Sequence, residues 1–229
     1  MQALFSLGKL VQLDFERCPR IHGGFVHLQG LSKLESLSIR CCQCIMDSDM
    51  EPLPGIASLK ELQVVCIYIT DYGVSYLGGL NKLVVLNMEG SHVTTSCLDT
   101  ISELPSQQSL NLNRYFLRDD GCEKFSALSD LNVLNLGFNH ITDECLGHLK
   151  GLTKLEGLNL DSCKITDDEF AHLSGIEHQP AKHNVALFKN NWCIFILIDV
   201  KSRVLDSNIF LICLSYWNLV ESLEFCLHL

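Results

Sequence analysis

Residues 131–143 read LNVLNLGFNHITD, and residues 155–167 repeat the pattern as LEGLNLDSCKITD. The two segments share the phrase L-x-x-L-x-L, a polar stretch and the triplet Ile-Thr-Asp. The second leucine of the phrase recurs along most of the chain, and the interval between successive copies is nearly constant. A period kept over this length indicates a repeat architecture. The seven positions are Leu13, Leu37, Leu62, Leu86, Leu110, Leu134 and Leu158.

Each repeat predicts a short strand followed by a short helix. In the L-x-L part the two leucines face one side of a strand, and the residue between them faces the other side. A unit this short cannot bury its apolar face alone, so neighbouring units must stack on one another. We therefore predict an α/β fold, a right-handed solenoid with a concave parallel sheet, convex short helices and about seven repeats of about 24 residues each.

Short polar residues mark the expected helix starts. They stand two positions after the apolar residue that follows each strand, where an oxygen can accept hydrogen bonds from free helix amides. Glycines mark the expected helix ends, in a left-handed conformation, at Gly30, Gly79 and Gly151. The predicted cap residues are Asp71, Thr95, Asp119, Asp143 and Asp167.

The residue after the strand phrase indicates a subclass of repeat. Cys18, Cys42 and Cys163 occupy the position that is Asn139 in another copy. Together with the Ile-Thr-Asp triplet, this resembles the cysteine-containing type of leucine-rich repeat, from about residue 4 to residue 176. The type is common in F-box/leucine-rich-repeat proteins and in related plant proteins that carry repeats only. In the former, the F-box recruits a cullin-type ubiquitin ligase and the repeats hold the substrate, so the resemblance implies protein binding.

Some repeats depart from the pattern. The second repeat holds one extra residue between Ile39 and Asp47, which predicts a small bulge in a turn. The fifth repeat has Gln107 in place of its first leucine. We expect the departing repeats to be the least stable. The residues that replace the cysteine or asparagine are Ile67, Ser91 and Tyr115.

The composition indicates a folded protein with excess negative charge. Of 229 residues, 47% are hydrophobic, and 17 Lys and Arg against 27 Asp and Glu leave a net charge of −10. This charge argues against nucleic acid as a partner, and no apolar run reaches the roughly 18 residues of a membrane helix. The first residues do not resemble a signal peptide. The 12 cysteines, several at one repeat position, then predict buried thiols in the cytoplasm or nucleus rather than a disulfide framework.

The repeat pattern divides the chain in two. Residues 1–176 form the predicted solenoid, which we expect to be N-terminally incomplete because Leu4 and Leu7 already read as the helix of a repeat. Periodicity ends after Ile176, since Lys182 stands where the next strand leucine belongs. Three interpretations stay open for residues 177–229: a C-terminal cap, a membrane-associating segment, or aberrant translated non-coding sequence.

Two kinds of column are expected on the strand face. The residues between the strand leucines become four stacked asparagines, at Asn87, Asn111, Asn135 and Asn159, which either bond to one another and stiffen the sheet or face a partner. The next columns are expected to be exposed on rigid strands, and they are the candidate binding face. Arg114, Tyr115 and Phe138 are the first choices for mutation, because Arg and aromatic residues most often anchor interfaces. The predicted partner-binding residues are Glu16, Arg17, Arg40, Glu89, Asn113, Arg114, Phe138 and Asp161.

The sequence predicts no catalytic, cofactor or metal site. Cys41, Cys42 and Cys44 lack the fourth ligand and the paired spacing of a zinc site. No nucleophile motif or phosphate-binding glycine loop is present. The predicted function is a non-catalytic module that binds another protein on its concave face. Two alternatives stay open: the substrate-recognition part of an F-box-type ubiquitin ligase, and a truncated gene product without independent function.

Overall fold

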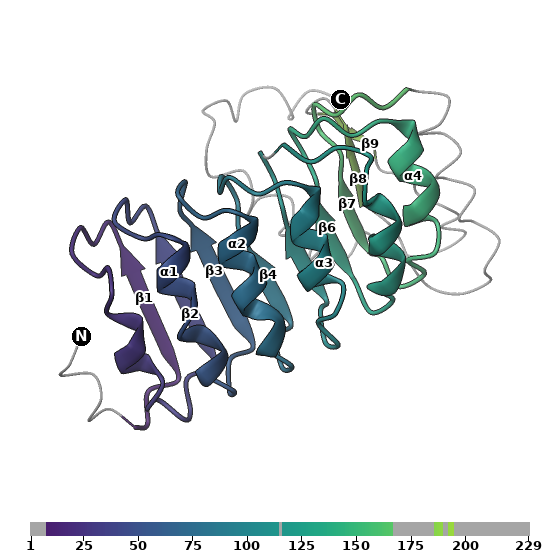
Figure 1. Cartoon of the computed structure of the whole chain (residues 1–229). Helices are drawn as coiled ribbons and strands as arrows, with labels where there is room; N and C mark the ends of the chain where they lie inside the picture. The colour runs from purple at the N-terminus through teal and green to yellow at the C-terminus, as the bar shows by residue number, and fades with distance from the viewer. Residues whose placement is uncertain (1–7, 115, 167–185, 190–191, 195–229) are drawn as a thin grey trace, which may run out of the picture. The chain divides into compact units, whose positions relative to one another are not determined.

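The computed structural model describes residues 8–114, 116–166, 186–189 and 192–194. The described strands form one sheet in which neighbours along the chain are neighbours in space. The short helices lie in a row on one side of this sheet (Figure 1). The seven repeat strands are β1 (Gln12–Glu16), β2 (Ser36–Arg40), β3 (Glu61–Val65), β4 (Val85–Asn87), β5 (Ser109–Asn111), β6 (Val133–Asn135) and β7 (Gly157–Asn159).

The helical side of each repeat is short and irregular. Only α4 exceeds five residues among the α-helices of the described chain, and several repeats use a 3-10 helix instead of, or next to, an α-helix. No helix of the described residues has the length and apolar sequence that crossing a membrane requires. The α-helices are α1 (Asp47–Met50), α2 (Asp71–Ser75), α3 (Leu98–Ile101) and α4 (Asp143–Leu149); the 3-10 helices are η2 (Phe25–Leu28), η3 (Leu53–Gly55), η4 (Tyr76–Gly79), η5 (Thr95–Cys97) and η6 (Cys122–Ala127).

The seven strand leucines pair in one register. Leu86 lies beside Leu110, Leu110 beside Leu134, and Leu134 beside Leu158, all in parallel. The same register runs through the first four strands. From Leu37 onward these leucines are buried, because each is covered by the repeats on both sides. The predicted stack of repeats with a parallel sheet and short helices is confirmed.

The helix caps lie one residue before the predicted positions, and the predicted aspartates instead make a contact between repeats. The helix starts at Thr70, Thr94 and Thr142 are capped by the threonine itself, whose hydroxyl oxygen accepts from the amide two residues on. In four repeats an aspartate one position further along the chain accepts two hydrogen bonds from the threonine of the next repeat. The resulting Asp–Thr pairs are Asp47–Thr70, Asp71–Thr94, Asp119–Thr142 and Asp143–Thr166.

Removing one of these aspartates is expected to weaken the stack. In the first pair, the Thr70 amide and hydroxyl donate to Asp47 at 2.8 and 2.6 Å. Asp47→Ala should lower the free energy of unfolding by about 1–2 kcal/mol, because charge-assisted bonds from partly buried donors are lost. Asp47→Asn keeps one acceptor and should cost about half as much. Urea unfolding of the three proteins measures the difference, and equal losses for both variants would show that the charge, not the two-bond contact, is what matters.

Two further expectations about turns are corrected. Positive φ among the described glycines occurs only at Gly23, Gly90 and Gly121, so the helices do not end in a left-handed glycine at Gly30, Gly79 or Gly151. Instead, the apolar residue after the glycine closes the turn, as Leu80 does with φ −86° and ψ 66° and its amide bonded to Leu77. In the third repeat, Cys66 rather than Ile67 takes the thiol position. The Cys66 thiol donates to the carbonyl of Ile39, while Ile67 is exposed.

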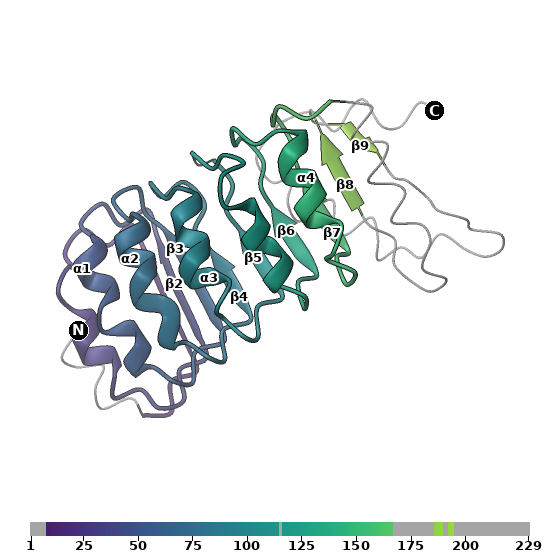
Figure 2. The ribbon, with the colours of Figure 1, turned by 45° about the vertical axis from the view of Figure 1, so that its right-hand side comes forward.

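The sheet extends beyond the seventh repeat. β8 (Ala186–Lys189) pairs in parallel with β7, and Leu187 lies in register with Leu158, although the chain between them is longer than one repeat. β9 (Trp192–Ile194) then pairs with β8 in antiparallel fashion (Figure 2). The predicted boundary at residue 176, the cap residue Asp167 and most of residues 177–229 lie outside the described part of the chain, as do residues 1–7.

Candidate functional site

The stacked asparagines have a structural role at the ends of the strands. The Oδ1 atoms of Asn87, Asn111 and Asn159 accept from the backbone amides of residues 89, 113 and 161 at 2.8–3.0 Å, and Asn135 accepts from Gly137 at 3.2 Å. These bonds lie within a repeat, whereas the first of the two interpretations above had each asparagine bonded to the asparagine of the next repeat. Each asparagine therefore folds the chain at the end of its strand, as Asx turns do.

The residue that follows this turn has a left-handed backbone in nearly every repeat. Gly90 takes it with φ 74°, and non-glycine residues take it elsewhere at a steric cost of about 1 kcal/mol each. The side chains at this position are mostly exposed, because the backbone turns them away from the buried leucines. The non-glycine members are Arg17, Cys41, Arg114, Phe138 and Ser162.

Among the predicted binding residues, Arg114 and Phe138 form the best-defined pair. The Arg114 guanidinium lies over the Phe138 ring, 5.5 Å from its centroid. Phe138 stays 45% exposed, and its amide donates to the carbonyl of Asp161 at 2.6 Å. The pair is thus held by the backbone of two repeats while its side chains face solvent. Tyr115, predicted beside them, lies outside the described residues.

A second group of predicted residues lies at the first two strands. Arg40 donates to Asp14 at 2.7 Å and pairs with Glu16 at 3.5 Å, and Glu16 also pairs with Arg17 at 3.5 Å. All four side chains are largely solvated, so each ion pair adds little stability. The structure therefore brings Glu16, Arg17 and Arg40 together, in a network whose charges largely compensate one another.

The expectation of exposure is wrong for two of the predicted residues. Asn113 is only 9% exposed and Asp161 only 7%. Both turn inward because the Asx turn pulls their amides back toward the strand, and a Cβ at the neighbouring Gly137 would lie only 3.3 Å from Asn113 Oδ1. Glu89 is half-buried in the equivalent turn. The side chains of these three residues are therefore less available to a partner than the sequence predicted.

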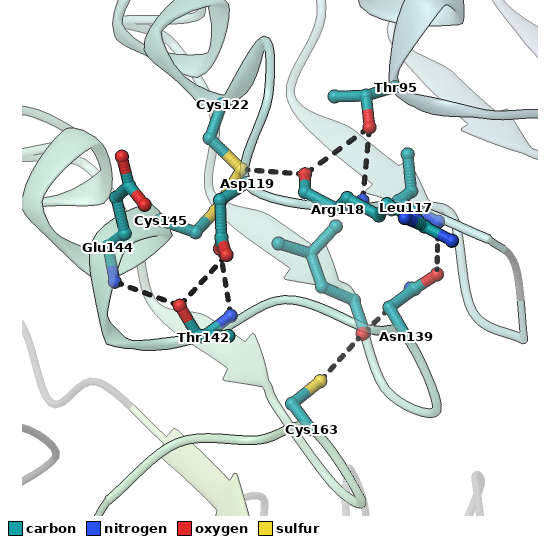
Figure 3. The surroundings of a disulfide bond; sticks show 11 residues. Thr95, Leu117, Arg118, Asp119, Cys122, Asn139, Thr142, Glu144, Cys145 and Cys163 are labelled. Carbon is teal, nitrogen blue, oxygen red and sulfur yellow. Dashed lines mark hydrogen bonds between the residues drawn. A yellow bond between two sulfur atoms is a disulfide. The ribbon is translucent and has the colours of Figure 1, made fainter.

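A disulfide joins the fifth and sixth repeats on the helical side. Cys122 at the start of η6 is bonded to Cys145 in α4, beside the Asp119–Thr142 pair (Figure 3). The cysteine pattern predicted buried thiols rather than disulfides, and this prediction is wrong for Cys122 and Cys145. The sulfurs and the Asp119 carboxylate lie within 4.8 Å of one another. They do not make a metal site in this state, because the sulfurs are bonded together and both Asp119 oxygens accept from Thr142.

The thiols at the fixed repeat position act as buried hydrogen-bond donors. Cys42 and Cys163 donate to the carbonyls of Phe15 and Leu136 in the preceding repeats. Burial raises the pKa of Cys42, and it raises the pKa of Cys66 and of Cys163 to about 11. These residues are therefore neutral thiols at physiological pH and poor nucleophiles or metal ligands, whereas Cys41 is exposed.

Asn139 makes the same contact with more bonds than the thiols do. It is 2% exposed, and its amide group donates to Leu112 and Leu136 at 2.9 and 2.8 Å. Its Oδ1 accepts from the Leu117 amide at 3.2 Å (Figure 3). The polar residue at this position thus satisfies carbonyls of two repeats at once, which explains why cysteine, serine and asparagine all occur there.

The fold of this chain is similar to that of known leucine-rich repeat structures. A family model described as a leucine-rich repeat matches residues 127–146. An internalin from Listeria monocytogenes, inlF, is similar with a TM-score of 0.62 and 24% identity, covering 80% of this chain and 51% of its own. The chain has the leucine-rich repeat fold. The internalin inlC2 of the same species has a TM-score of 0.55 and 20% identity, covering 82% and 84%. No curated protein matches.

At these identities the likeness shows the fold. Leucine-rich repeats typically bind proteins or peptides and are typically non-catalytic, because their function lies in a repeated exposed surface rather than in one enclosed site. The chain spans about half of the inlF structure.

Proposed function

We propose that this leucine-rich repeat protein is a non-catalytic module that binds another protein on the strand face, with Arg114 and Phe138 at the centre of the contact. The observation that carries the proposal is the pair itself. Arg and aromatic side chains are the commonest interface anchors, and here they stack on each other at 5.5 Å on backbones fixed by two repeats. A rigid anchor loses little conformational freedom when a partner binds.

The backbone at Phe138 offers a sharp test. Phe138 holds a left-handed conformation that Gly90 holds at the equivalent position, so Phe138→Gly removes the ring and relieves the steric cost together. The variant should lose at least about tenfold in partner affinity, the effect expected for an interface anchor, while its melting temperature stays the same or rises. Ser162→Gly makes the same backbone change without removing a ring, and it is the matched control.

The measurement is a pull-down with the full chain, followed by identification and titration of the captured protein. A defined partner that is retained by wild type and Ser162→Gly, but lost by Phe138→Gly and Arg114→Ala, supports the proposal. A partner held equally well by Phe138→Gly would show that the binding face lies elsewhere.

A finer version assigns the chain to the cysteine-containing class of repeats, working in the cytoplasm or nucleus as the substrate-recognition part of a ubiquitin ligase. The specific support is the row of buried thiols, Cys42, Cys66 and Cys163, that donate across repeats. Recovery of cullin adaptors in the same pull-down would favour this role, and their absence alongside a defined partner would favour the simpler binding module. Failure of the full chain to accumulate in cells would favour a truncated product without independent function.

A further inference from the structure

A recess of about 340 Å³ lies among the loops that follow β5, β6 and β7, lined by Arg118, Asp119, His140 and Lys164. We propose that this recess binds an acidic side chain of a partner peptide. The inference rests on the proposed function only for the statement that the partner is a protein. It goes further in naming the chemistry that the partner presents and the place where that chemistry is bound.

The recess belongs to a regular row of exposed residues, which we call the loop-edge column. Its members are the residues that directly precede the buried Ile, Val or Leu after each strand, and from the third repeat they are Tyr68, His92, Phe116, His140 and Lys164. Their positions are fixed by backbone bonds between repeats. The amides of His92, His140 and Lys164 donate to the carbonyls of the preceding repeat at 2.7, 2.9 and 3.0 Å.

The loop-edge column is aromatic toward β3 and basic toward β7. Phe116 is 55% exposed and stacks on His92 with ring centroids 6.2 Å apart. His140 and Lys164 follow on the next two repeats, and Arg118 lies beside them. A partner segment that crosses the column therefore meets apolar rings and cationic groups side by side.

Arg118 owes its place to a break in the row of Asp–Thr pairs. The third, fourth, sixth and seventh repeats have threonine at this position, bonded to the aspartate of the repeat before. Here the previous repeat has Thr95, whose hydroxyl donates to the Arg118 carbonyl at 3.3 Å and accepts from the Arg118 amide at 3.1 Å (Figure 3). The backbone of Arg118 thus makes the hydrogen bonds to the Thr95 hydroxyl, and the Arg118 side chain takes no part in this contact and lines the recess.

The recess carries more positive than negative charge, because Arg118 and Lys164 stand against one carboxylate, that of Asp119. Neither Arg118 nor Lys164 forms an ion pair with any described residue. Both Asp119 oxygens already accept from Thr142, at 2.8 Å each. In a chain with a net charge of −10, a local excess of cationic groups marks a site for an anion, and a guanidinium next to an ammonium suits a carboxylate. A nucleic acid would be repelled by the rest of the surface.

The test uses the full chain and a fluorescein-labelled peptide in which glutamate, leucine and serine repeat, compared with the same peptide carrying glutamine for glutamate. We expect the acidic peptide to raise the fluorescence anisotropy and the glutamine peptide to bind at least tenfold more weakly. Arg118→Gln and Lys164→Gln should each lower the affinity several-fold, and added salt should weaken it further. Lys82→Gln, an exposed lysine outside the recess, is the matched control.

Each outcome decides the point. Equal binding of both peptides, or equal losses for Lys82→Gln and Lys164→Gln, would overturn the inference. Competition by millimolar inorganic phosphate as strong as that by the unlabelled peptide would show a small-anion site only, and would also overturn it. If the peptide does not bind but Phe138→Gly still releases the captured partner, the proposed function stands and only the recess is excluded. If the peptide binds as expected but Phe138→Gly keeps the partner, the proposed anchor is excluded and the recess stands.

Discussion

Replacing Asn139 with alanine is expected to lower the free energy of unfolding by about 3–5 kcal/mol, because several buried hydrogen bonds are lost and their backbone partners stay buried. The side chain is 2% exposed and bonds to Leu112, Leu136 and Leu117. Alanine leaves the Leu112 carbonyl and the Leu117 amide without their side-chain partner, while the Leu136 carbonyl keeps the Cys163 thiol as a donor. The measurement is urea unfolding followed by circular dichroism.

The repeats themselves offer the control. Asn139→Cys introduces the residue that the seventh repeat has at Cys163, which donates to the Leu136 carbonyl at 3.2 Å. A thiol at residue 139 can satisfy one carbonyl but cannot accept usefully from the Leu117 amide, so about half of the loss should be recovered. Equal destabilisation by cysteine and alanine would contradict the proposed role of this position as a donor between repeats.

Reduction of the Cys122–Cys145 disulfide is expected to cost about 3 kcal/mol of stability, because the bond closes a loop of 23 residues in the unfolded chain. For a protein of this size, that corresponds to a fall of roughly 6–12 °C in melting temperature. The bond also ties η6 to α4, close to the place where Thr95 stands instead of the aspartate that other repeats carry. Calorimetry of oxidised and reduced protein measures the difference.

Single cysteine variants make this measurement specific. Cys122→Ser should melt at the same temperature with and without reductant, whereas Cys97→Ser should keep the redox-dependent difference, since Cys97 is a buried free thiol in η5. Trapping the thiols at the moment of cell lysis also tests the proposed location. An oxidised Cys122–Cys145 pair in living cells would contradict a reducing cytoplasm or nucleus.

Much of the fold follows from the spacing of a few leucines. Leu86, Leu110, Leu134 and Leu158 lie side by side because a constant period returns each to the same place in its repeat, and stacking is the arrangement that buries all of them. The candidate site was less predictable. Arg114 and Phe138 could be chosen from their residue types and their position in the repeat. The burial of Asn113 and Asp161 could not be predicted in this way, because it depends on an Asx turn at the end of the strand.

Two of the differences between prediction and structure share one cause, which is that the bonding partner lies a full repeat away in the sequence. Asp71 and Asp143 were predicted to cap helices, yet their carboxylates bond to Thr94 and Thr166 of the following repeats. Cys122 and Cys145 stand at different places in the repeat pattern, so no column pairs them, and only the packing of η6 on α4 brings them together. Lys164 likewise reaches the recess beside Arg118 through stacking alone.

By itself, the sequence determined the repeat, the strand register, the buried file of leucines and the side of the sheet that is polar, because periodic burial depends only on residue spacing. The tertiary structure decided which polar groups meet: the Asp–Thr pairs, the disulfide, the Arg114–Phe138 stack and the basic recess. The physical reason is that burial is non-directional and tolerates small shifts, whereas hydrogen bonds, ion pairs and sulfur bridges depend on distances of a few tenths of an ångström between different repeats.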